Sequence, residues 1–110
     1  MKVPRKISIA GHEISIKHKK GLNVGGQEAW GVWDDAKHII YLRFGMDKTR
    51  KQEILIHEII HAIDHIHVLH LSERVVKILG VEIVAVLRNN NLKLIEQRKS
   101  RVTPKKIERK

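Results

Sequence analysis

Residues 55–64 read LIHEIIHAID, and this stretch decides the fold because it predicts a buried helix that carries a metal site. His57, Glu58 and His61 form the pattern HExxH. Residues four apart lie on one face of a helix, so the two imidazoles can bind one Zn²⁺ at roughly 2.0–2.1 Å. Glu58 can take the proton of a water that the metal acidifies toward a pKa of about 7. The pattern therefore predicts zinc-dependent hydrolysis of peptide bonds, with Glu58 as the general base.

The residues around this pattern favour a helix that is packed on more than one side. Thr49 and Gln52 have the spacing of a capping box, which predicts an active-site helix over residues 49–66. Apolar residues recur along it and make one wide stripe: Leu55, Ile59, Ile63 and Ile66, with Ile56, Ile60 and Ala62 beside them. Such a helix belongs in the centre of a domain. The alternative to a metal site is a histidine-rich core helix whose imidazoles are only hydrogen-bonded.

A catalytic zinc ion needs a third protein ligand, and the histidines after His61 are the first candidates. His67 follows His61 by six residues, as in HExxHxxGxxH, but Asp64 occupies the position of the glycine that turns that chain. His65 continues the same helix and is expected to point along it. His70 falls in the connection that follows and can swing toward the metal. Asp64 is also a candidate to orient a ligating imidazole by accepting its hydrogen bond.

Carboxylates on the next predicted helix are the other candidates. Ser72 is a good N-cap, and the apolar pattern after it predicts a helix over residues 72–88. Glu73 opens this helix, and a tight antiparallel helix pair would bring its carboxylate back level with the metal. Glu82 lies further along the helix and is expected to lie past the metal. The residues leave both Glu73 and His70 open as the third ligand.

The residues before the two helices predict a small, mostly antiparallel sheet within residues 1–45. Residues 3–20 alternate between apolar and polar side chains on either side of a glycine, as in a hairpin. Residues 21–29 contain three glycines without periodicity and are expected to form a loop. Residues 30–33 and 38–44 are expected to be two further strands joined by a turn.

The chain of 110 residues is long enough for one small domain. We expect an α+β domain over residues 1–91 and a basic tail over residues 92–110. The chain has no cysteine, so histidines and carboxylates are the expected ligands of any metal. The N-terminus lacks the apolar core of a signal peptide, which favours a cytoplasmic protein. The high isoleucine and lysine content is of a kind associated with thermophilic proteins.

The net charge of +10 is concentrated near the end of the chain. Seven basic residues and one glutamate in residues 98–110 give +6, which leaves +4 for residues 1–97. Only four aromatic residues, one Tyr, one Phe and two Trp, accompany this charge, whereas proteins that bind single strands stack bases on aromatic side chains. The pattern favours a solvated basic tail over a nucleic-acid groove, and membrane insertion is not expected.

The segments LIHEIIHAID and LSERVVKILGVEIVAVLRNN resemble the minigluzincins, which are very small zinc peptidases of the gluzincin type. The resemblance covers roughly residues 30–90 and implies a minimal zincin-like domain. The second segment also resembles the ExxAxxxA pattern of the glutamate helix in HtpX-like and ImmA-like peptidases. That pattern falls on Glu73, Val76 and Gly80, so the resemblance implies Glu73 as the third zinc ligand. Valine and glycine replace the two alanines, and a small residue at Gly80 would let the helices approach closely.

The resemblance also implies roles for two other parts of the chain. In gluzincins an edge strand above the cleft pairs with the extended substrate, and residues 30–33 or 38–44 are the strands available for this. Minigluzincin-like proteins resemble zymogens, so residues 92–110 are expected to inhibit the site or to drive self-association. Two other functions stay open: a SprT-like protease that acts on nucleic-acid-associated proteins, and a non-enzymatic basic interaction module.

Overall fold

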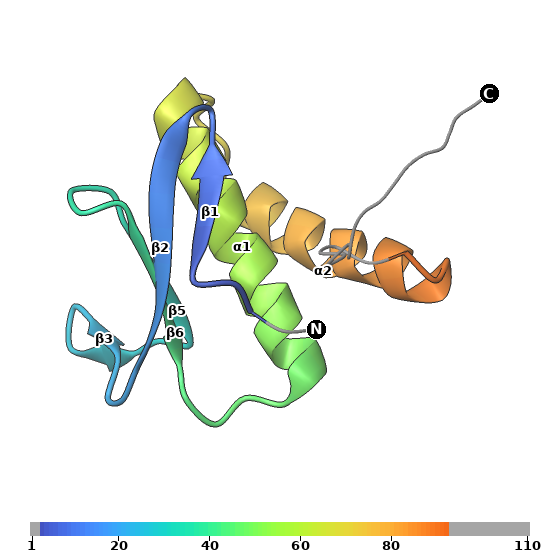
Figure 1. Cartoon of the computed structure of the whole chain (residues 1–110), viewed down its shortest axis with the longest axis horizontal. Coiled ribbons are helices and arrows are strands. Elements are labelled where there is room, and N and C mark those ends of the chain that lie inside the picture. The colour runs from blue at the N-terminus through green and yellow to red at the C-terminus, as the bar shows by residue number, and fades with distance from the viewer. Residues whose placement is uncertain (1–2, 93–110) are drawn as a thin grey trace, which may run out of the picture.

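The structure is a computed structural model that describes residues 3–92, and these form an α+β domain in which a small sheet precedes two helices. The helix that carries HExxH lies between the sheet on one side and the second helix on the other (Figure 1). The mixed α+β class that the sequence predicts is therefore confirmed. The predicted tail falls outside the described residues from position 93 onward.

The first two strands form the predicted hairpin. β1 (Lys6–Ile9) pairs with β2 (His12–Lys19) in antiparallel register. Ala10 and Gly11 make the turn, and both have positive φ angles, 50° and 81°. Two successive residues with positive φ match the right-handed twist of the strands on either side.

The predicted pair of later strands is also present, but its place in the sheet differs from the expectation. β5 (Gly31–Asp34) and β6 (Ile39–Arg43) pair in antiparallel register. β6 then pairs with β2 in parallel, so the strand order is β1-β2-β6-β5. The prediction of a mostly antiparallel sheet is thus correct for the β1–β2 and β5–β6 pairs. It fails at the central β2–β6 pair, which is parallel and is called the parallel seam below. β6 is an interior strand, so the prediction that residues 38–44 offer a free edge is wrong, whereas β5 does form an edge.

The glycine-rich stretch predicted as a loop contains a short hairpin of its own. β3 (Asn23–Val24) pairs with β4 (Gln27–Glu28), and Gly25 and Gly26 turn the chain with φ angles of 59° and 84°. Two residues per strand are too few to show a period of two, which explains why the alternation was not visible in the sequence.

The first helix, α1 (Lys48–His67), begins one residue earlier than predicted. Asp47 is its N-cap, because Asp47 Oδ1 accepts a hydrogen bond of 2.8 Å from the backbone N–H of Arg50. The predicted capping box at Thr49 is therefore wrong. Aspartate and threonine are both good caps, and the earlier residue takes the role here.

The second helix, α2 (Glu73–Asn89), starts where the sequence predicts. Ser72 Oγ accepts a hydrogen bond of 3.2 Å from the backbone N–H of Val75, which confirms Ser72 as the N-cap. Near the other end, Asn91 adopts a positive φ of 56°, a conformation that asparagine tolerates well. The C-terminal half of α2 diverges from α1 and projects away from the sheet (Figure 1).

Two apolar clusters hold the layers together, and α1 contributes to both. The first lies between the sheet and α1 and is centred on Ile14, Ile40, Leu42 and Leu55. The second lies between α1 and α2 and is built from Ile56, Ile60, Val76 and Val84. The prediction that this helix is packed on more than one side is confirmed.

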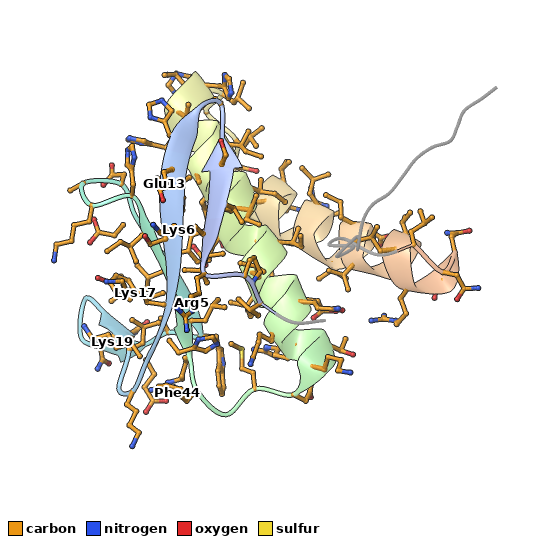
Figure 2. The ribbon with its side chains drawn as sticks, viewed as in Figure 1. Arg5, Lys6, Glu13, Lys17, Lys19 and Phe44 are labelled. Carbon is orange, nitrogen blue, oxygen red and sulfur yellow. The ribbon has the colours of Figure 1, made fainter. Side chains whose placement is uncertain are left out.

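The face of the sheet that points away from α1 is polar and mostly basic. Lys6, Glu13, Lys17 and Lys19 project from β1 and β2 on this face (Figure 2). Lys6 and Glu13 form an exposed ion pair of 2.9 Å. Among the helices of residues 3–92, none combines the length and the apolar character needed to cross a bilayer.

Candidate metal centre

The two histidines of HExxH face the same side of α1, one turn apart. Their Nε2 atoms lie 3.1 Å from each other, and both side chains are partly buried. This spacing follows from the helix itself, because residues i and i+4 stack along one face. The two nitrogens therefore converge at the boundary between α1 and α2.

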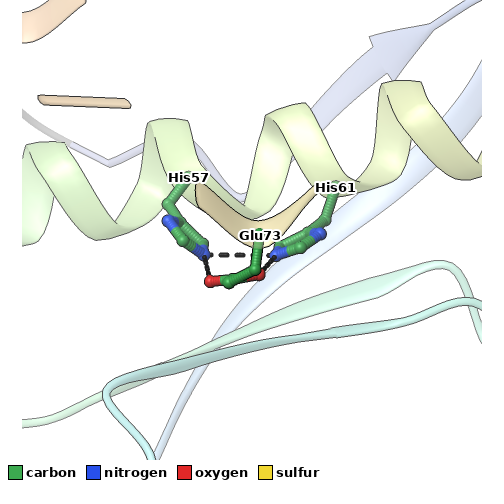
Figure 3. A group of neighbouring side chains, drawn as sticks. All are labelled: His57, His61 and Glu73. Atoms are coloured by element: carbon green, nitrogen blue, oxygen red, sulfur yellow. Dashed lines mark hydrogen bonds and ion pairs between the residues drawn. The ribbon is translucent and has the colours of Figure 1, made fainter. Parts of the chain in front are cut away.

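Glu73, the first residue of α2, completes a group of three. One carboxylate oxygen lies 3.0 Å from His57 Nε2, and the other lies 3.0 Å from His61 Nε2 (Figure 3). Ligand atoms bound tetrahedrally at about 2.0–2.1 Å from one zinc ion are roughly 3.3–3.4 Å apart. Two imidazole nitrogens and one carboxylate also match the donor set of a catalytic zinc site, so these residues fit the metal.

Hydrogen bonds alone do not satisfy this group. Each imidazole can donate to Glu73 only if its Nε2 carries a hydrogen. If both do, two N–H groups face each other at 3.1 Å; if one does not, its lone pair faces the carboxylate. With Glu73 ionised, every arrangement of protons on the two imidazoles leaves one of the three contacts repulsive, whereas a shared cation makes all three favourable.

The pKa of His57 is lowered, chiefly because burial disfavours the charged imidazolium. The nearby charges of His61 and Lys77 lower it further, and the carboxylate of Glu73 opposes the shift. A neutral imidazole is the form that binds a metal, so the surroundings of His57 favour the ligating state.

A close approach of the helices brings Glu73 to the histidines. Gly80 is buried against α1, and a Cβ at this position would lie 3.5 Å from the Cα and Cβ atoms of His57. Val76 is also fully buried here. The expectation that a small residue at position 80 permits close approach is confirmed.

The connection between the helices is held by Asp64. Its Oδ1 accepts a hydrogen bond of 3.2 Å from the backbone N–H of Leu71, and its backbone carbonyl accepts from Val68 and Leu69. Within residues 3–92 no hydrogen bond joins its carboxylate to an imidazole, so the structure shows Asp64 in the connection and its role in orienting a ligand stays a prediction. That connection determines where α2 begins, and hence where Glu73 lies.

Glu58 lies about 60–100° around α1 from the two histidines, on the flank of the helix that faces β5. Its side chain is only 6% exposed, and it is the one buried charged residue among residues 3–92. Burial, and to a smaller extent the negative charge of Glu73, raise the pKa of Glu58 to about 7, while a hydrogen bond from the backbone of Trp33 acts in the opposite direction. A carboxyl group held in this way beside a ligand cluster is typical of a catalytic base.

Gly31 makes room for Glu58. A Cβ at Gly31 would lie 2.5 Å from Ile54 Cγ2, a distance that side chains do not tolerate. It would also lie 3.1 Å from Glu58 Cγ, a tight contact that requires Glu58 to shift. The strand backbone therefore touches Glu58 directly. The sequence contains a signal for this contact, because an isolated glycine inside a strand often marks a close backbone approach, but we did not predict it.

The rival ligands lie elsewhere. His70 is exposed and has a positive φ of 61°. It lines an open pocket of about 460 Å³ beside the metal group, and none of His65, His67, His70 and Glu82 belongs to the convergent group in residues 3–92. The pocket is lined by Trp33, His61, Asp64, His65, Val68 and His70.

No protein family, curated protein or solved structure matches this chain. The resemblance to minigluzincins therefore stays a prediction. The arguments for function come from the group of His57, His61 and Glu73 and from the buried Glu58.

Proposed function

We propose that this chain is a zinc-dependent peptidase. The observation that carries the proposal is the convergence of His57, His61 and Glu73, whose contacts are 3.0–3.1 Å, next to a carboxyl group, that of Glu58, buried on the same helix. Three ligands and an adjacent base are the arrangement needed for metal-assisted hydrolysis. A histidine-rich core helix would require neither the third ligand nor the buried base.

His57, His61 and Glu73 would hold the ion. Zinc would act as a Lewis acid that polarises the scissile carbonyl and acidifies water. Glu58 would accept the proton of the attacking water as its oxygen bonds to the carbonyl carbon. Glu58 would then return that proton to the leaving amine as the C–N bond breaks. The backbone of β5 at Gly31 and Trp33 would keep its carboxyl group in place.

The edge strand β5 would bind the substrate. One side of β5 pairs with β6, and on the other side β5 is the edge of the sheet. An extended peptide can add to such an edge through main-chain hydrogen bonds, with little choice of sequence. The pocket between Trp33 and His70 lies beside His61 and would receive a substrate side chain.

The test is metal content together with hydrolysis of labelled casein. The purified full chain should contain about one zinc per chain and should lose hydrolysis when the zinc is chelated. Glu58→Gln should reduce hydrolysis by roughly 10²–10⁴-fold while zinc stays bound, because only the base is removed. Absence of stoichiometric zinc, or full activity in Glu58→Gln, would refute the proposal; the former result would favour a non-enzymatic interaction module.

Latency through the C-terminal segment is a part of this proposal that rests on the resemblance alone. Residues 93–110 lie outside the described part of the chain. Removal of residues 92–110 should raise the rate of casein hydrolysis if the segment inhibits the site. An unchanged rate would count against a zymogen.

A protease that acts on nucleic-acid-associated proteins is the second candidate. The feature that favours it is the basic face of the sheet that points away from α1, rather than the C-terminal tail. Lys17 and Lys19 project from β2 on this face (Figure 2). Lys17 pairs with Tyr41 of β6, and Lys19 Nζ lies 5.4 Å from the centre of the Tyr41 ring. Basic side chains beside an aromatic ring are a feature of surfaces that bind single strands. The double variant Lys17→Glu/Lys19→Glu should then abolish salt-dependent DNA binding, whereas Lys37→Glu, in the β5–β6 turn, should not.

A further inference from the structure

The surface of α2 that faces away from α1 is unusually apolar. Six large apolar side chains of this helix are more than a third exposed: Val75, Ile78, Leu79, Val81, Ile83 and Val86. A surface helix normally carries polar residues on its outer face, and a helix that is apolar all round is normally buried on all sides. The outer face of α2 therefore has the composition of an interface.

A line of three residues runs along the middle of this face. Arg74, Ile78 and Glu82 are four residues apart and so lie nearly in a row, with Ile78 46% exposed. Ile78, the middle of the row, lies about 160° around the helix from Gly80, which packs against α1. It therefore points directly away from the rest of the domain.

We propose that two copies of the chain form a dimer by packing α2 against α2 in antiparallel orientation, with Ile78 on the two-fold axis. In such a pair, the residue four positions before Ile78 lies opposite the residue four positions after it. Arg74 of each copy then meets Glu82 of the other, and the symmetry makes two such ion pairs. The row is therefore self-complementary. It carries a positive charge at one end, an apolar residue in the middle and a negative charge at the other end, so an antiparallel copy places opposite charges together.

The residues beside this row agree with the same register. Val75 and Val81 lie three positions before and after Ile78, so each meets the other across the axis, and both are exposed in one copy. No ion pair within residues 3–92 involves Arg74 or Glu82. Both charges are therefore available to a second copy.

The area of the surface fits a second copy. Ile83 lies about 140° around the helix from Ile78 and stays outside the proposed contact. The other five apolar side chains expose roughly 350 Å², which is most of the apolar share of one side of a standard protein interface of about 800 Å². α2 projects from the rest of the domain (Figure 1). Residues 93–110 are a poorer match for this face, because they contain ten charged and only four large apolar residues.

The test is sedimentation velocity of the full chain at micromolar concentrations, with and without a chelator, because the proposed dimer does not require metal. We expect a species of twice the chain mass that Ile78→Lys converts to a monomer, with helix content unchanged by circular dichroism. A chain that stays monomeric at about 100 μM would overturn the proposal, including the case in which residues 93–110 cover α2. A dimer that survives Ile78→Lys would overturn it as well.

A charge exchange tests the register. Arg74→Glu or Glu82→Arg alone would place like charges opposite each other and should weaken the dimer by about tenfold or more. The double variant Arg74→Glu/Glu82→Arg should restore it, because the two ends of the row are exchanged. Arg88→Glu, a charge reversal on the same helix outside the row, should have little effect. Failure of the double variant to restore the dimer would overturn the antiparallel register.

Discussion

The two sides of α1 differ in what they contribute to the site and in how far along the chain their partners lie. The side toward α2 carries His57 and His61, and their partner Glu73 follows only a few residues after α1 ends. The side toward the sheet carries Glu58, which lies against Gly31 of β5, much earlier in the chain. One side thus assembles the proposed ligands from neighbouring sequence, and the other places the proposed base through tertiary packing.

This difference suggests that metal binding and hydrolysis can be separated by mutation. Changes on the α2 side should act first on metal affinity, and changes on the sheet side should act on the base while the metal stays bound. The Glu58→Gln variant is the sheet-side half of this comparison.

The largest effect on the α2 side is expected from Glu73→Ala. Loss of the third ligand should weaken zinc binding by about 100-fold or more, measured by competition with a chromophoric chelator. Glu82→Ala on the same helix is the matched control and should bind zinc normally. If His70→Ala weakens zinc binding and Glu73→Ala does not, His70 is the ligand and the geometry assigned to α2 is wrong.

Next in size, a pair of glycine variants compares the two packing surfaces of α1 directly. Gly31→Ala should destabilise the fold by about 1–3 kcal/mol, because the new Cβ meets Ile54 and Glu58 at distances that are too short. Gly80→Ala should instead be neutral or stabilise by up to about 1 kcal/mol, because its Cβ makes ordinary contacts and alanine favours a helix. Urea unfolding measures both. Equal effects of the two variants would contradict the difference in contact distances.

Asp64→Ala tests the connection that positions α2. Loss of the hydrogen bond to the N–H of Leu71 should cost about 1 kcal/mol of stability and should also weaken zinc binding, because α2 would start in a less well-defined place. Asp35→Ala removes another carboxylate, one that lies 3.4 Å from His65, and serves as the control. A loss of stability without any loss of zinc affinity would show that the connection does not position Glu73.

The smallest expected effect is a pH dependence on the sheet side. Burial, together with the charge of Lys51, lowers the pKa of His18, and its buried Nε2 has no hydrogen-bond partner within residues 3–92. The unfolded chain therefore binds a proton more readily at this residue, so stability should fall as the pH drops below about 6.5. His18→Gln should flatten the urea midpoint between about pH 7 and 5 relative to the unchanged chain. An identical pH profile in both proteins would contradict this assignment.

The parts of the fold and site that the sequence predicts correctly are those with local causes. The spacing of His57 and His61, the cap at Ser72 and the first hairpin all depend on residues close in sequence. Glu73 was one of two open candidates, and helix geometry alone does not choose between them. The parallel seam of β2 and β6 was missed because its register depends on strands far apart in the chain. The contact of Gly31 with Glu58 was missed for the same reason.

The helix start shows a different limit. Asp47 and Thr49 are both competent caps, and the difference in free energy between two such starts is smaller than the tertiary effects that decide between them. The apolar pattern of α2 likewise does not predict that its C-terminal half diverges from α1. The apolar outer face of α2 was visible, but the sequence alone does not distinguish a buried surface from an exposed one.

The parallel seam in the sheet has a consequence for how the chain folds. β1–β2 and β5–β6 are each hairpins whose strands are adjacent in sequence, so each can form early and on its own. The sheet is complete only when the two hairpins dock side by side, with Ser15 beside Ile39, and no turn guides that step. Docking closes the longest loop in the sheet, so this step should limit the rate of folding. The group of His57, His61 and Glu73 joins residues that are close in sequence, so it should form faster. At the proposed site, the two helices would then offer zinc its ligands before the edge strand reaches Glu58.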